Sequence, residues 1–511
     1  MSFKLQTSDG VFVVGAGIMG AGIAQVAAQA GHPVMLFDAR EGAASDAILK
    51  LGATLDALVA KGKVTEEAAT ATLARISAAT NISDAASAGL VIEAIVENLD
   101  AKRALFKQIE DVASQTCVLA SNTSSISITA LANGLKRPGR LVGMHFFNPV
   151  PVMKLVEVVA GLQTTSDVAD AVLALAGAWG KVGVLARSTP GFIVNRIARP
   201  YYAETLALLQ ERAAEPEVLD ACLRGAGFRM GPCELMDLIG HDTNLSVTQS
   251  VYEANFGDKR FGPSLVQREL VDGGLLGRKS GRGFYDYGAS GARAPESGAQ
   301  PSQLPPAENI VLHGRGVAVD RWIAALEHEG RSFTHSADSD WIGLETDAGQ
   351  LRMTDGRSAA LVAVREQARD LALFDLPIAL GGGAPGASLA WSVSGGASER
   401  WRTLAPQWLA AAGWTPRQLA DAAGLVVART IAMLINEAAD AVLHGVCTEQ
   451  AADSAMKLGV NYPAGPFEWL AAWNVHAVVK LLDHLDNQHR GERYRVSREL
   501  RQRDWLQEGS R

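Results

Sequence analysis

A histidine and a glutamate in neighbouring strand-like segments are the residues of this sequence best suited to move a proton. His145 lies in the apolar run Gly143–Phe147, and Glu157 lies among valines and leucines in the segment Lys154–Val159. A lone carboxylate buried there would be costly unless it were paired or hydrogen-bonded. We expect Glu157 to pair with His145, fix the tautomer of the imidazole and make it a general base. A satisfied core histidine is the competing interpretation.

A glycine-rich turn near the N-terminus indicates a dinucleotide site. Residues 15–20 have the spacing GxGxxG and join the strand-like run Val11–Val14 to an alanine-rich, helix-like stretch that ends at Gly31. Such a turn lets the backbone approach a pyrophosphate, which then lies at the positive end of a helix. The residues expected to contact the cofactor here are Gly15, Gly17, Ile18, Met19 and Gly20.

The second strand of this unit is expected to end at an aspartate. Val34–Phe37 is typical of a buried strand, and Asp38 follows it, 18 residues after Gly20. An acidic residue in this place accepts the ribose hydroxyls and repels a 2′-phosphate, so we expect NAD rather than NADP. Arg40 would soften that preference, and a solvated carboxylate at a strand end is the competing interpretation.

Further along the chain, the pattern changes from strands and helices to helices alone. Buried strands are expected at Leu90–Ile95 and Val118–Ser121, with a helix over Asp100–Ser114 between them. Beyond the break at Thr189-Pro-Gly191, the sequence is helical from Phe192 to Glu211. Alternating strands and helices are typical of a doubly wound parallel sheet, so the pattern predicts a Rossmann-type domain followed by an all-α domain.

The helical region occurs twice. In the first copy Arg196 and Gly231 are 35 positions apart, and in the second the matching Arg429 and Gly465 are 36 positions apart. Glu204 matches Glu437 in the same alignment. Asn195 is replaced by Ala428, and no His-Phe-Phe-Asn-Pro run precedes the second copy. We therefore expect the second copy to be non-catalytic and to pack against the first copy or against another subunit.

A weaker echo of the glycine turn precedes the second copy. The strand-like run from Ile310 is followed by Gly314 and Gly316, but Val319 stands at the third glycine position. No acidic residue closes a clear second strand. We expect a degenerate Rossmann-like domain that has lost its dinucleotide.

These patterns divide the chain into five parts. They are an NAD-binding Rossmann domain (1–189), a helical domain (190–287), a linker (288–308), a degenerate Rossmann-like domain (309–412) and a second helical domain (413–511).

Composition excludes several classes of protein. The 511 residues carry a net charge of −8, which gives no basic footprint for nucleic acid. The four cysteines form no CxxC pair, as in a reducing compartment. The N-terminus lacks an apolar signal region, and no stretch is long and apolar enough to span a bilayer. We expect a cytoplasmic enzyme with no membrane segment, no nucleic-acid partner and no metal site.

Taken in order, the segments between residues 10 and 287 resemble the 3-hydroxyacyl-CoA dehydrogenase family. The resemblance rests on the histidine segment 143–159 and on four further stretches, which are 91–102, 121–128, 189–196 and 277–287. It implies that NAD is the cofactor and that a 3-hydroxyacyl-CoA is oxidised to a 3-oxoacyl-CoA. The second half, with the segments 458–463, 491–495 and 500–503, resembles the long two-copy form of the family. For that form, we expect 3-hydroxyadipyl-CoA, in phenylacetate catabolism, as substrate.

The resemblance also implies a role for each residue of the proton-transfer site. His145 would take the proton of the 3-hydroxyl while hydride leaves the same carbon for the nicotinamide, and Glu157 would orient His145. Ser124 and Asn195 would hydrogen-bond around the reacting oxygen, and Asn148 would help to place nicotinamide and substrate. For Ser124 the competing interpretation is a helix cap, and for Asn195 it is a hydrogen bond between the two domains.

Residues that line the cofactor and the thioester follow from the same resemblance. Cofactor contacts are implied for the glycine turn and Asp38, and for Ala94, Glu97, Lys102, Asn122, Ser124 and Asn148. Lys61 and Thr54 would contact CoA, although the loop Lys61–Lys63 also fits an ordinary solvated basic loop. A terminal carboxylate on the substrate would need a cation, for which Arg199 and Arg229 are the candidates.

Three alternatives stay open at this point. The substrate is either the dicarboxylic thioester or a short-chain one such as 3-hydroxybutyryl-CoA of general fatty-acid metabolism. A free 3-hydroxy acid would suit the same fold, and a non-catalytic NAD-binding scaffold is the third possibility. The alanine- and leucine-rich helical domains suggest a homodimer, although a duplicated chain would be able to satisfy that interface internally.

Overall fold

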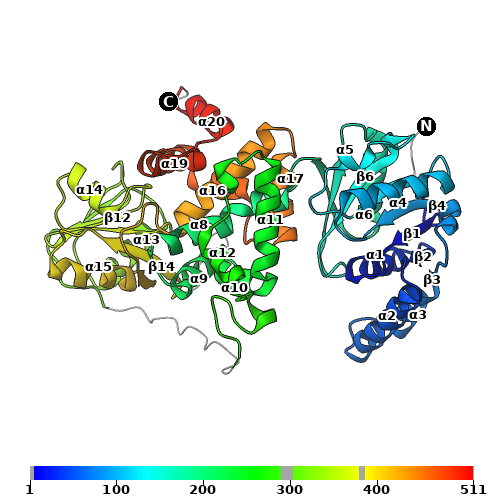
Figure 1. Ribbon diagram of the computed structural model, residues 1–511. Coiled ribbons are helices and arrows are strands. Elements are labelled where there is room, and N and C mark those ends of the chain that lie inside the picture. Colours follow the sequence, from blue (N-terminus) through cyan, green and yellow to red (C-terminus); the bar gives the residue numbers. More distant parts are fainter. Residues whose placement is uncertain (1–4, 289–302, 379–385, 510–511) are drawn as a thin grey trace. The chain divides into compact units, whose positions relative to one another are not determined.

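Two compact units make up the part of the chain that the computed structural model describes, which is residues 5–288, 303–378 and 386–509 (Figure 1). The first unit contains the chain up to Arg196 together with His444–Val460. The second contains Ile197–Leu443 and the chain from Asn461 onward. The first unit thus takes a segment from the second helical copy, which a linear division of the sequence does not anticipate.

The first unit is built on an eight-stranded sheet in the order β3-β2-β1-β4-β5-β6-β7-β8. All neighbouring strands are parallel except β6 and β7. The strands are β1 (Gly10–Val14), β2 (Val34–Phe37), β3 (Ile76–Ala78), β4 (Ala88–Glu93), β5 (Val118–Ser121), β6 (Leu141–Phe146), β7 (Leu155–Ala160) and β8 (Val182–Arg187). Every side chain of β5 and β6 is buried, as expected for a sheet that is covered on both faces.

Helices connect and cover these strands. They are α1 (Ile18–Gln29), α2 (Ala43–Ala60), α3 (Glu66–Ala74), α4 (Leu99–Val112), α5 (Ile128–Ala132), α6 (Ser166–Ala178) and α17 (Glu449–Gly459), with short 3₁₀ turns at Ile82–Ser87 and Pro138–Arg140. Helices α2 and α3 form a pair that projects away from the sheet (Figure 1). The predicted β1–α1–β2 unit is confirmed. Strand β4 begins and ends two residues earlier than the expected Leu90–Ile95.

The helix expected over Phe192–Glu211 is interrupted. It is divided into α7 (Val194–Ile197) and α8 (Arg199–Gln210). Pro200 lies in the first turn of α8, where it has no N–H to donate and its ring would clash with the carbonyl of residue 196 in a continuous helix. The single-helix prediction was therefore wrong at this point.

The second unit contains most of both helical copies. The first copy supplies α8, α9 (Pro216–Gly225), α10 (Pro232–Ile239), α11 (His241–Ala254) and α12 (Leu265–Asp272). The second supplies α16 (Val427–Leu443), α18 (Pro466–Trp473), α19 (Val475–His489) and α20 (Arg498–Glu508). Further 3₁₀ turns lie at Lys259–Phe261, Arg278–Ser280 and Glu492–Tyr494.

The repeat seen in the sequence extends to the backbone. Gly191 and Phe192 have φ angles of +77° and +48°, and Gly424 and Leu425 have +72° and +53°. Left-handed angles are uncommon for non-glycine residues, so finding them at matched positions indicates the same tight turn. Each copy enters its first helices through this turn.

A buried ion-pair network joins the two copies. Glu204 of α8 is fully buried and accepts hydrogen bonds from Arg429 of α16 at 2.7 Å and from Arg493 at 2.8 Å. In the reverse direction, Arg260 of the first copy donates to Glu437 of α16 at 3.2 Å. The matched glutamates Glu204 and Glu437 therefore each bind an arginine of the other copy.

A second sheet, also in the second unit, has seven strands in the order β10-β9-β11-β12-β13-β14-β15. Its strands are β9 (Val311–His313), β10 (Thr334–Ser336), β11 (Gly343–Thr346), β12 (Gly349–Met353), β13 (Leu371–Phe374), β14 (Ser388–Val393) and β15 (Thr415–Gln418). Its helices are α13 (Val317–His328), α14 (Ala359–Arg365) and α15 (Glu399–Ala411). Antiparallel β11 and β12 stand where a Rossmann fold has parallel strands, so the domain is a reduced form.

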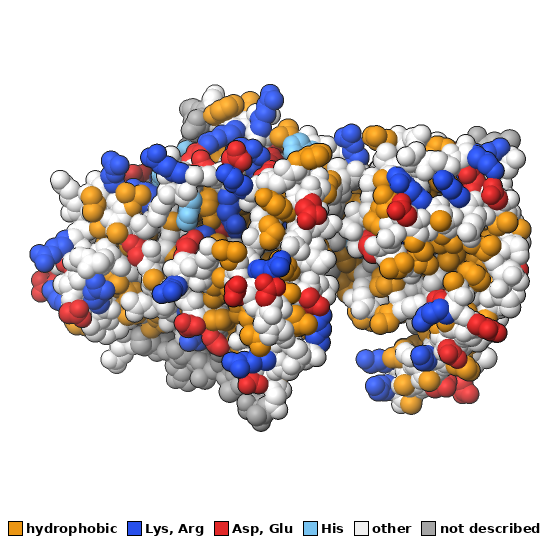
Figure 2. Space-filling view, in the orientation of Figure 1, with side chains coloured by type: hydrophobic (Ala, Val, Ile, Leu, Met, Phe, Trp, Pro, Cys, Tyr) orange, Lys and Arg blue, Asp and Glu red, His pale blue; other side chains and the backbone are white. Residues whose placement is uncertain are grey.

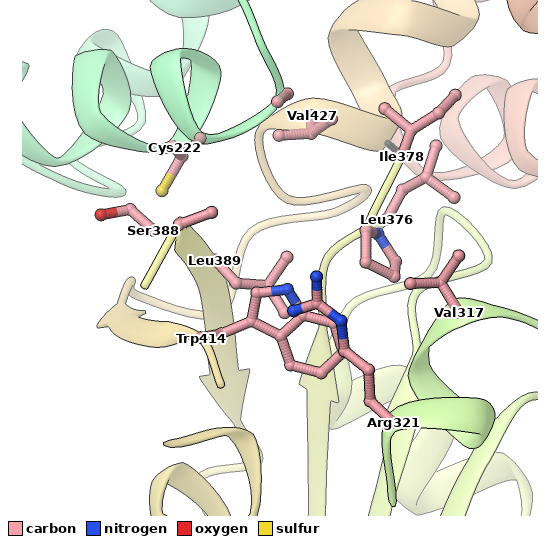
Figure 3. Close-up of a pocket in the computed structure, with 13 residues that line it drawn as sticks. Cys222, Val317, Arg321, Leu376, Ile378, Ser388, Leu389, Trp414 and Val427 are labelled. Carbon is pink, nitrogen blue, oxygen red and sulfur yellow. The ribbon is translucent and has the colours of Figure 1, made fainter. Parts of the chain in front are cut away.

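Side chains fill the crevice that follows β13. Figure 3 shows Trp414 and Arg321 crossing it, with Leu376 and Leu389 beside them. The guanidinium of Arg321 lies 4.6 Å from the centre of the Trp414 ring. About 20 Å³ remains, close to the size of one water molecule. The loss of the dinucleotide from the reduced domain stays a prediction.

Candidate active site

His145 and Glu157 face each other on adjacent antiparallel strands. The register of β6 and β7 pairs these two residues directly. The Nδ1 atom of His145 lies 2.6 Å from Oε2 of Glu157. Glu157 is fully buried, and His145 is only 5% exposed. The expected pairing is therefore present, and it leaves Nε2 as the ring nitrogen that is able to accept a proton.

The second oxygen of Glu157 is used as well. Its Oε1 atom accepts hydrogen bonds from the backbone N–H groups of Ile193 and Val194, at 2.9 and 3.0 Å. The rings of Phe147 and Phe192 lie 4.5 and 5.9 Å from the imidazole of His145. These contacts fix the carboxylate, and through it the imidazole, at the start of α7.

Ser124 and Asn195 lie near one another, at the end of β5 and in α7. The Asn195 amide donates to the backbone carbonyl of Ser124 at 3.5 Å. The backbone N–H of Ser124 donates to Glu97 at 3.0 Å. The adjacent helix α5 is capped by Ser127 rather than by Ser124. The helix-cap interpretation of the serine run therefore applies to a different serine.

Lys102 and Glu93 are buried and form a polar cluster with the more exposed Glu97. The Lys102 ammonium lies 2.5 Å from Glu93 and 3.2 Å from Glu97. Glu93 also accepts from the Ser121 hydroxyl at 2.6 Å. Although burial opposes it, the charge of Lys102 together with the donors of Thr123 and Ser124 holds the pKa of Glu97 below its usual value. Lys102 is only 1% exposed, and its ammonium donates to the backbone carbonyl of Ile95, in the loop after β4, at 3.5 Å. It therefore holds this loop from the buried side.

Glu93 was missed from the sequence, although a signal was present. It is a carboxylate at the end of the apolar, buried strand Ala88–Glu93, and the cost of burying a lone carboxylate, which pointed to Glu157, applies to it as well. Asn122 is also used structurally, because its side-chain oxygen accepts from the backbone N–H of Phe146 at 2.9 Å. This bond ties the end of β5 to the end of β6, next to His145.

The glycine turn has the geometry that a pyrophosphate requires. Gly15 has φ +106°, and a Cβ there would lie 2.5 Å from the carbonyl oxygen of Ala94. A Cβ on Gly20 would lie 1.7 Å from the carbonyl oxygen of Gly15, whereas one on Gly17 would meet nothing within 4 Å. The turn thus packs tightly against the protein at Gly15 and Gly20 and leaves open space at Gly17, where a dinucleotide would have room to approach. Met19 packs against the core beneath it.

Asp38 lies just beyond β2 and close to this turn. Its carboxylate accepts from the backbone N–H of Ala16 at 2.8 Å and from that of Arg40 at 3.0 Å. Partial burial opposes ionisation, but the Arg40 side chain and these two N–H donors hold the pKa of Asp38 below its usual value. Asp38 therefore carries a negative charge at neutral pH, beside the place where the ribose of NAD would lie.

Replacing Asp38 by asparagine is expected to weaken the preference for NAD over NADP. The loss of charge-assisted hydrogen bonds to the ribose costs about 1.5–3 kcal/mol, or roughly tenfold to a hundredfold in kcat/KM with NAD. The repulsion of a 2′-phosphate is lost at the same time, which leaves the Arg40 cation to attract it. The measurement is kcat/KM with each cofactor. Arg40→Gln is the control and should still prefer NAD, and an unchanged preference in Asp38→Asn would refute the role.

A groove of about 690 Å³ runs beside the glycine turn. Of the expected site residues, it brings together Gly17, Ile18, Asn148 and Thr54. Its other lining residues include Gln25, Arg40, Lys50 and Pro149–Val152. In Figure 2, hydrophobic side chains gather over α1, and basic side chains lie at the free end of the α2–α3 pair. Lys61, at the end of α2, is exposed and does not line the groove.

The two arginines considered for a terminal carboxylate differ in their surroundings. Arg199 is buried, donates to the Thr248 hydroxyl at 3.1 Å and stacks on Tyr202 at 4.9 Å. Arg229 is exposed. Arg199 is thus engaged in the helical core, and a role of either arginine toward a terminal carboxylate stays a prediction.

Three family models match the chain. They describe the NAD-binding domain of 3-hydroxyacyl-CoA dehydrogenase (residues 10–189), the C-terminal domain of the same family (191–287 and again 424–510) and the reduced Rossmann-fold domain of 3-hydroxybutyryl-CoA dehydrogenase (351–422). The double match of the C-terminal model confirms the repeat. The predicted fold class is likewise confirmed: a Rossmann domain, a helical domain, a second, reduced Rossmann domain and a repeated helical domain.

Relatives match over the whole chain or over its first half. The chain is 44% identical over 510 residues to 3-hydroxyadipyl-CoA dehydrogenase of Escherichia coli K12, covering 100% of this chain and 99% of that protein. A crystal structure of 3-hydroxybutyryl-CoA dehydrogenase from E. coli K12 has a TM-score of 0.88 at 41% identity, over 99% of this chain and 100% of that chain. A probable 3-hydroxybutyryl-CoA dehydrogenase of Bacillus subtilis is 44% identical over 278 residues, 54% of this chain and 96% of that protein. Within the described residues, no helix is long and apolar enough to cross a membrane.

Proposed function

Because this chain belongs to the 3-hydroxyacyl-CoA dehydrogenase family and is an NAD-dependent enzyme of that class, we propose that it oxidises 3-hydroxyadipyl-CoA with His145 as the general base. The observation that carries the mechanism is the 2.6 Å contact between His145 Nδ1 and Glu157. It holds the ring in the tautomer whose Nε2 atom is unprotonated, as a proton acceptor must be.

The proposed chemistry divides between the cofactor and the protein. NAD, when bound along the glycine turn and Asp38, supplies the acceptor for the hydride that leaves the 3-carbon. His145 takes the proton of the 3-hydroxyl at Nε2, and Glu157 stabilises the imidazolium that results. The product is a 3-oxoacyl-CoA. In the reverse direction, His145 returns the proton.

Other residues have positioning roles in this proposal. Ser124 and Asn195 orient the reacting oxygen or the carbonyl, and Asn148 places nicotinamide and substrate. Cofactor contacts are assigned to Ala94, Glu97, Lys102 and Asn122, of which Lys102 and Asn122 act by holding their loops. Thr54, in the groove beside the turn, and Lys61 are assigned to the CoA nucleotide.

The dicarboxylic substrate is supported by the full-length relative, which is a 3-hydroxyadipyl-CoA dehydrogenase. A second candidate is 3-hydroxybutyryl-CoA, because the similar solved structure is of a 3-hydroxybutyryl-CoA dehydrogenase. We assign oxidation of the first thioester to phenylacetate catabolism and oxidation of the second to general fatty-acid metabolism.

The deciding experiment measures NADH formation with the two thioesters side by side. We expect a higher kcat/KM with 3-hydroxyadipyl-CoA, and the opposite order would favour the second candidate. Free 3-hydroxyadipate is included as a third substrate. Turnover of the free acid at a comparable rate would refute the thioester requirement.

We further propose that the protein acts in the cytoplasm and forms a homodimer. The alternative is that the duplicated chain satisfies the helical interface internally, which the contact of Glu204 with Arg429 supports. Sedimentation equilibrium separates a 53.9 kDa monomer from a dimer. The proposed divisions of the chain are those given above, at 1–189, 190–287, 288–308, 309–412 and 413–511.

A further inference from the structure

Residues 444–460 come from the second helical copy but belong by their contacts to the first unit. They comprise α17 and the loop before it, and the repeat aligns them with residues 211–227 of the first copy. We infer that this segment is a positioning element of the active site. It holds β7 and the turn at Ile193 and Val194, and through them the carboxylate of Glu157. The inference rests on the proposed function, in which Glu157 orients His145.

The loop before α17 contacts residues on both sides of the turn at Ile193 and Val194. The backbone N–H of Arg187, the last residue of β8, donates to the carbonyl of Val446 at 2.8 Å. The Arg187 guanidinium donates to the carbonyl of His444 at 3.3 Å, and that of Arg196 lies 3.2 Å from the His444 ring. Arg196 is two residues beyond Val194. The loop therefore ties the edge of the sheet to the first turn of α7.

The end of α17 touches the two groups that hold Glu157. A Cβ on Gly459 would lie 2.7 Å from a methyl carbon of Leu155 and 3.1 Å from one of Val194. Leu155 precedes Glu157 by two residues on β7, so both side chains are on the same face of the strand. Val194 supplies one of the N–H groups that Glu157 accepts. A larger residue at Gly459 would press on both.

The loop also contributes an uncharged group near Glu157. Burial, together with the negative charge of Glu157, raises the pKa of the Cys447 thiol to about 12. The thiol therefore stays neutral and adds no second negative charge beside Glu157.

The second unit contains the reciprocal arrangement, in which a helix of the first copy packs on the sheet of the second half. Helix α9 is the first copy's counterpart of α17, and it packs on β14 of the reduced sheet. Strand β14 stands between β13 and β15 as β7 stands between β6 and β8, with the same parallel and antiparallel pairings. A Cβ on Gly225 of α9 would lie 2.4 Å from the backbone oxygen of Ser388. Each helical copy thus packs one helix against the sheet that belongs to the other half of the chain.

The test is a valine at Gly459 in the full-length chain, with Gly177→Val as the matched control. Gly177 lies in α6 of the same unit, and a Cβ there would meet nothing within 4 Å. We expect Gly459→Val to lower kcat by about 10²-fold, because small misplacement of catalytic groups costs rates of that order. The dissociation constant for NAD, measured by calorimetry, should stay that of the wild type. Gly177→Val should match the wild type in both measurements.

Two further readouts separate positioning from general damage. Hydrogen exchange of the Ile193 and Val194 amides should be faster in Gly459→Val than in Gly177→Val, and this needs no substrate. Adding Leu155→Ala, which makes room for the valine, should restore both the exchange rates and much of kcat. Gly459→Ala, with a smaller intrusion, provides the same comparison if the valine variant does not fold.

Unchanged kcat and unchanged exchange in the Gly459 variants would overturn the inference. A loss of kcat with normal exchange at Ile193 and Val194 would overturn it too. A wild-type chain that is inactive on both thioesters would instead refute the proposed function, and amide exchange would still decide the role of residues 444–460.

Discussion

Replacing His145 by alanine is expected to lower kcat for 3-hydroxyacyl-CoA oxidation by about 10²–10⁴-fold, the contribution typical of a positioned general base. In the proposed mechanism the imidazole, which lies 2.6 Å from Glu157, is the proton acceptor, and alanine leaves only water in that role. Binding of NAD should persist, because the glycine turn and Asp38 are on β1, α1 and β2. Stopped-flow or steady-state NADH absorbance measures the rate, and calorimetry measures NAD binding.

A matched histidine provides the control for this prediction. His328 lies exposed in the last turn of α13, and His328→Ala should keep the wild-type rate. If His145→Ala also kept that rate, some other group would have to accept the proton. The assignment of His145 and Glu157 would then fail together.

Replacing Glu204 by glutamine is expected to lower the free energy of unfolding by about 3–5 kcal/mol, as when one partner of a buried ion pair is removed. Arg429 is fully buried and donates to both Glu204 and Glu211, and Arg493 donates to Glu204 as well. A neutral amide would leave Arg429 and Arg493 with much less compensating charge. Urea unfolding of the full-length variant, followed by tryptophan fluorescence, measures the loss.

The size of this effect should depend on pH in a defined direction. Burial opposes ionisation of Glu204, but Arg493 and Arg429 hold the pKa of its carboxyl below the usual value. The stabilisation is therefore present above the pKa of the unfolded chain and is lost as the pH falls through the lower, folded pKa. The difference between wild type and Glu204→Gln should shrink on acidification.

An exposed ion pair is the control for the stability prediction. Asp272 pairs with Arg268 at 2.9 Å, and both side chains are 54% exposed. Asp272→Asn should change the free energy of unfolding by no more than about 1 kcal/mol. A loss for Glu204→Gln as small as that of Asp272→Asn would show that the network contributes little to stability.

Local patterns were sufficient for much of the active site. The strand Val34–Phe37 and the pairing of His145 with Glu157 follow from apolar runs and from the cost of a buried carboxylate. The glycine turn and Asp38 follow from spacing alone. These features depend on residues close together in the chain or on adjacent strands, so a single sequence contains the information.

Long-range choices of partner were not accessible in the same way. The sequence shows that Glu157 needs a partner, but not that Ile193 and Val194 donate to its second oxygen. It also does not show that the Ser121 hydroxyl donates to Glu93. The pairing of donors with acceptors is decided when elements far apart in the sequence pack together. The spacing of apolar residues within one element contains no information about that packing.

The packing of α17 and α9, each on the sheet of the other half of the chain, has a consequence for how the two halves are able to differ in sequence. The second half has lost a candidate catalytic residue, with Ala428 in the place of Asn195, and yet its α17 still buttresses Leu155 and Val194. A fragment that ended at Tyr287 would contain all the reactive groups and lack that buttress. On the inference drawn above, the two halves therefore depend on each other: the second half contains no counterpart of Asn195, but it supplies a helix that packs on a strand of the first sheet.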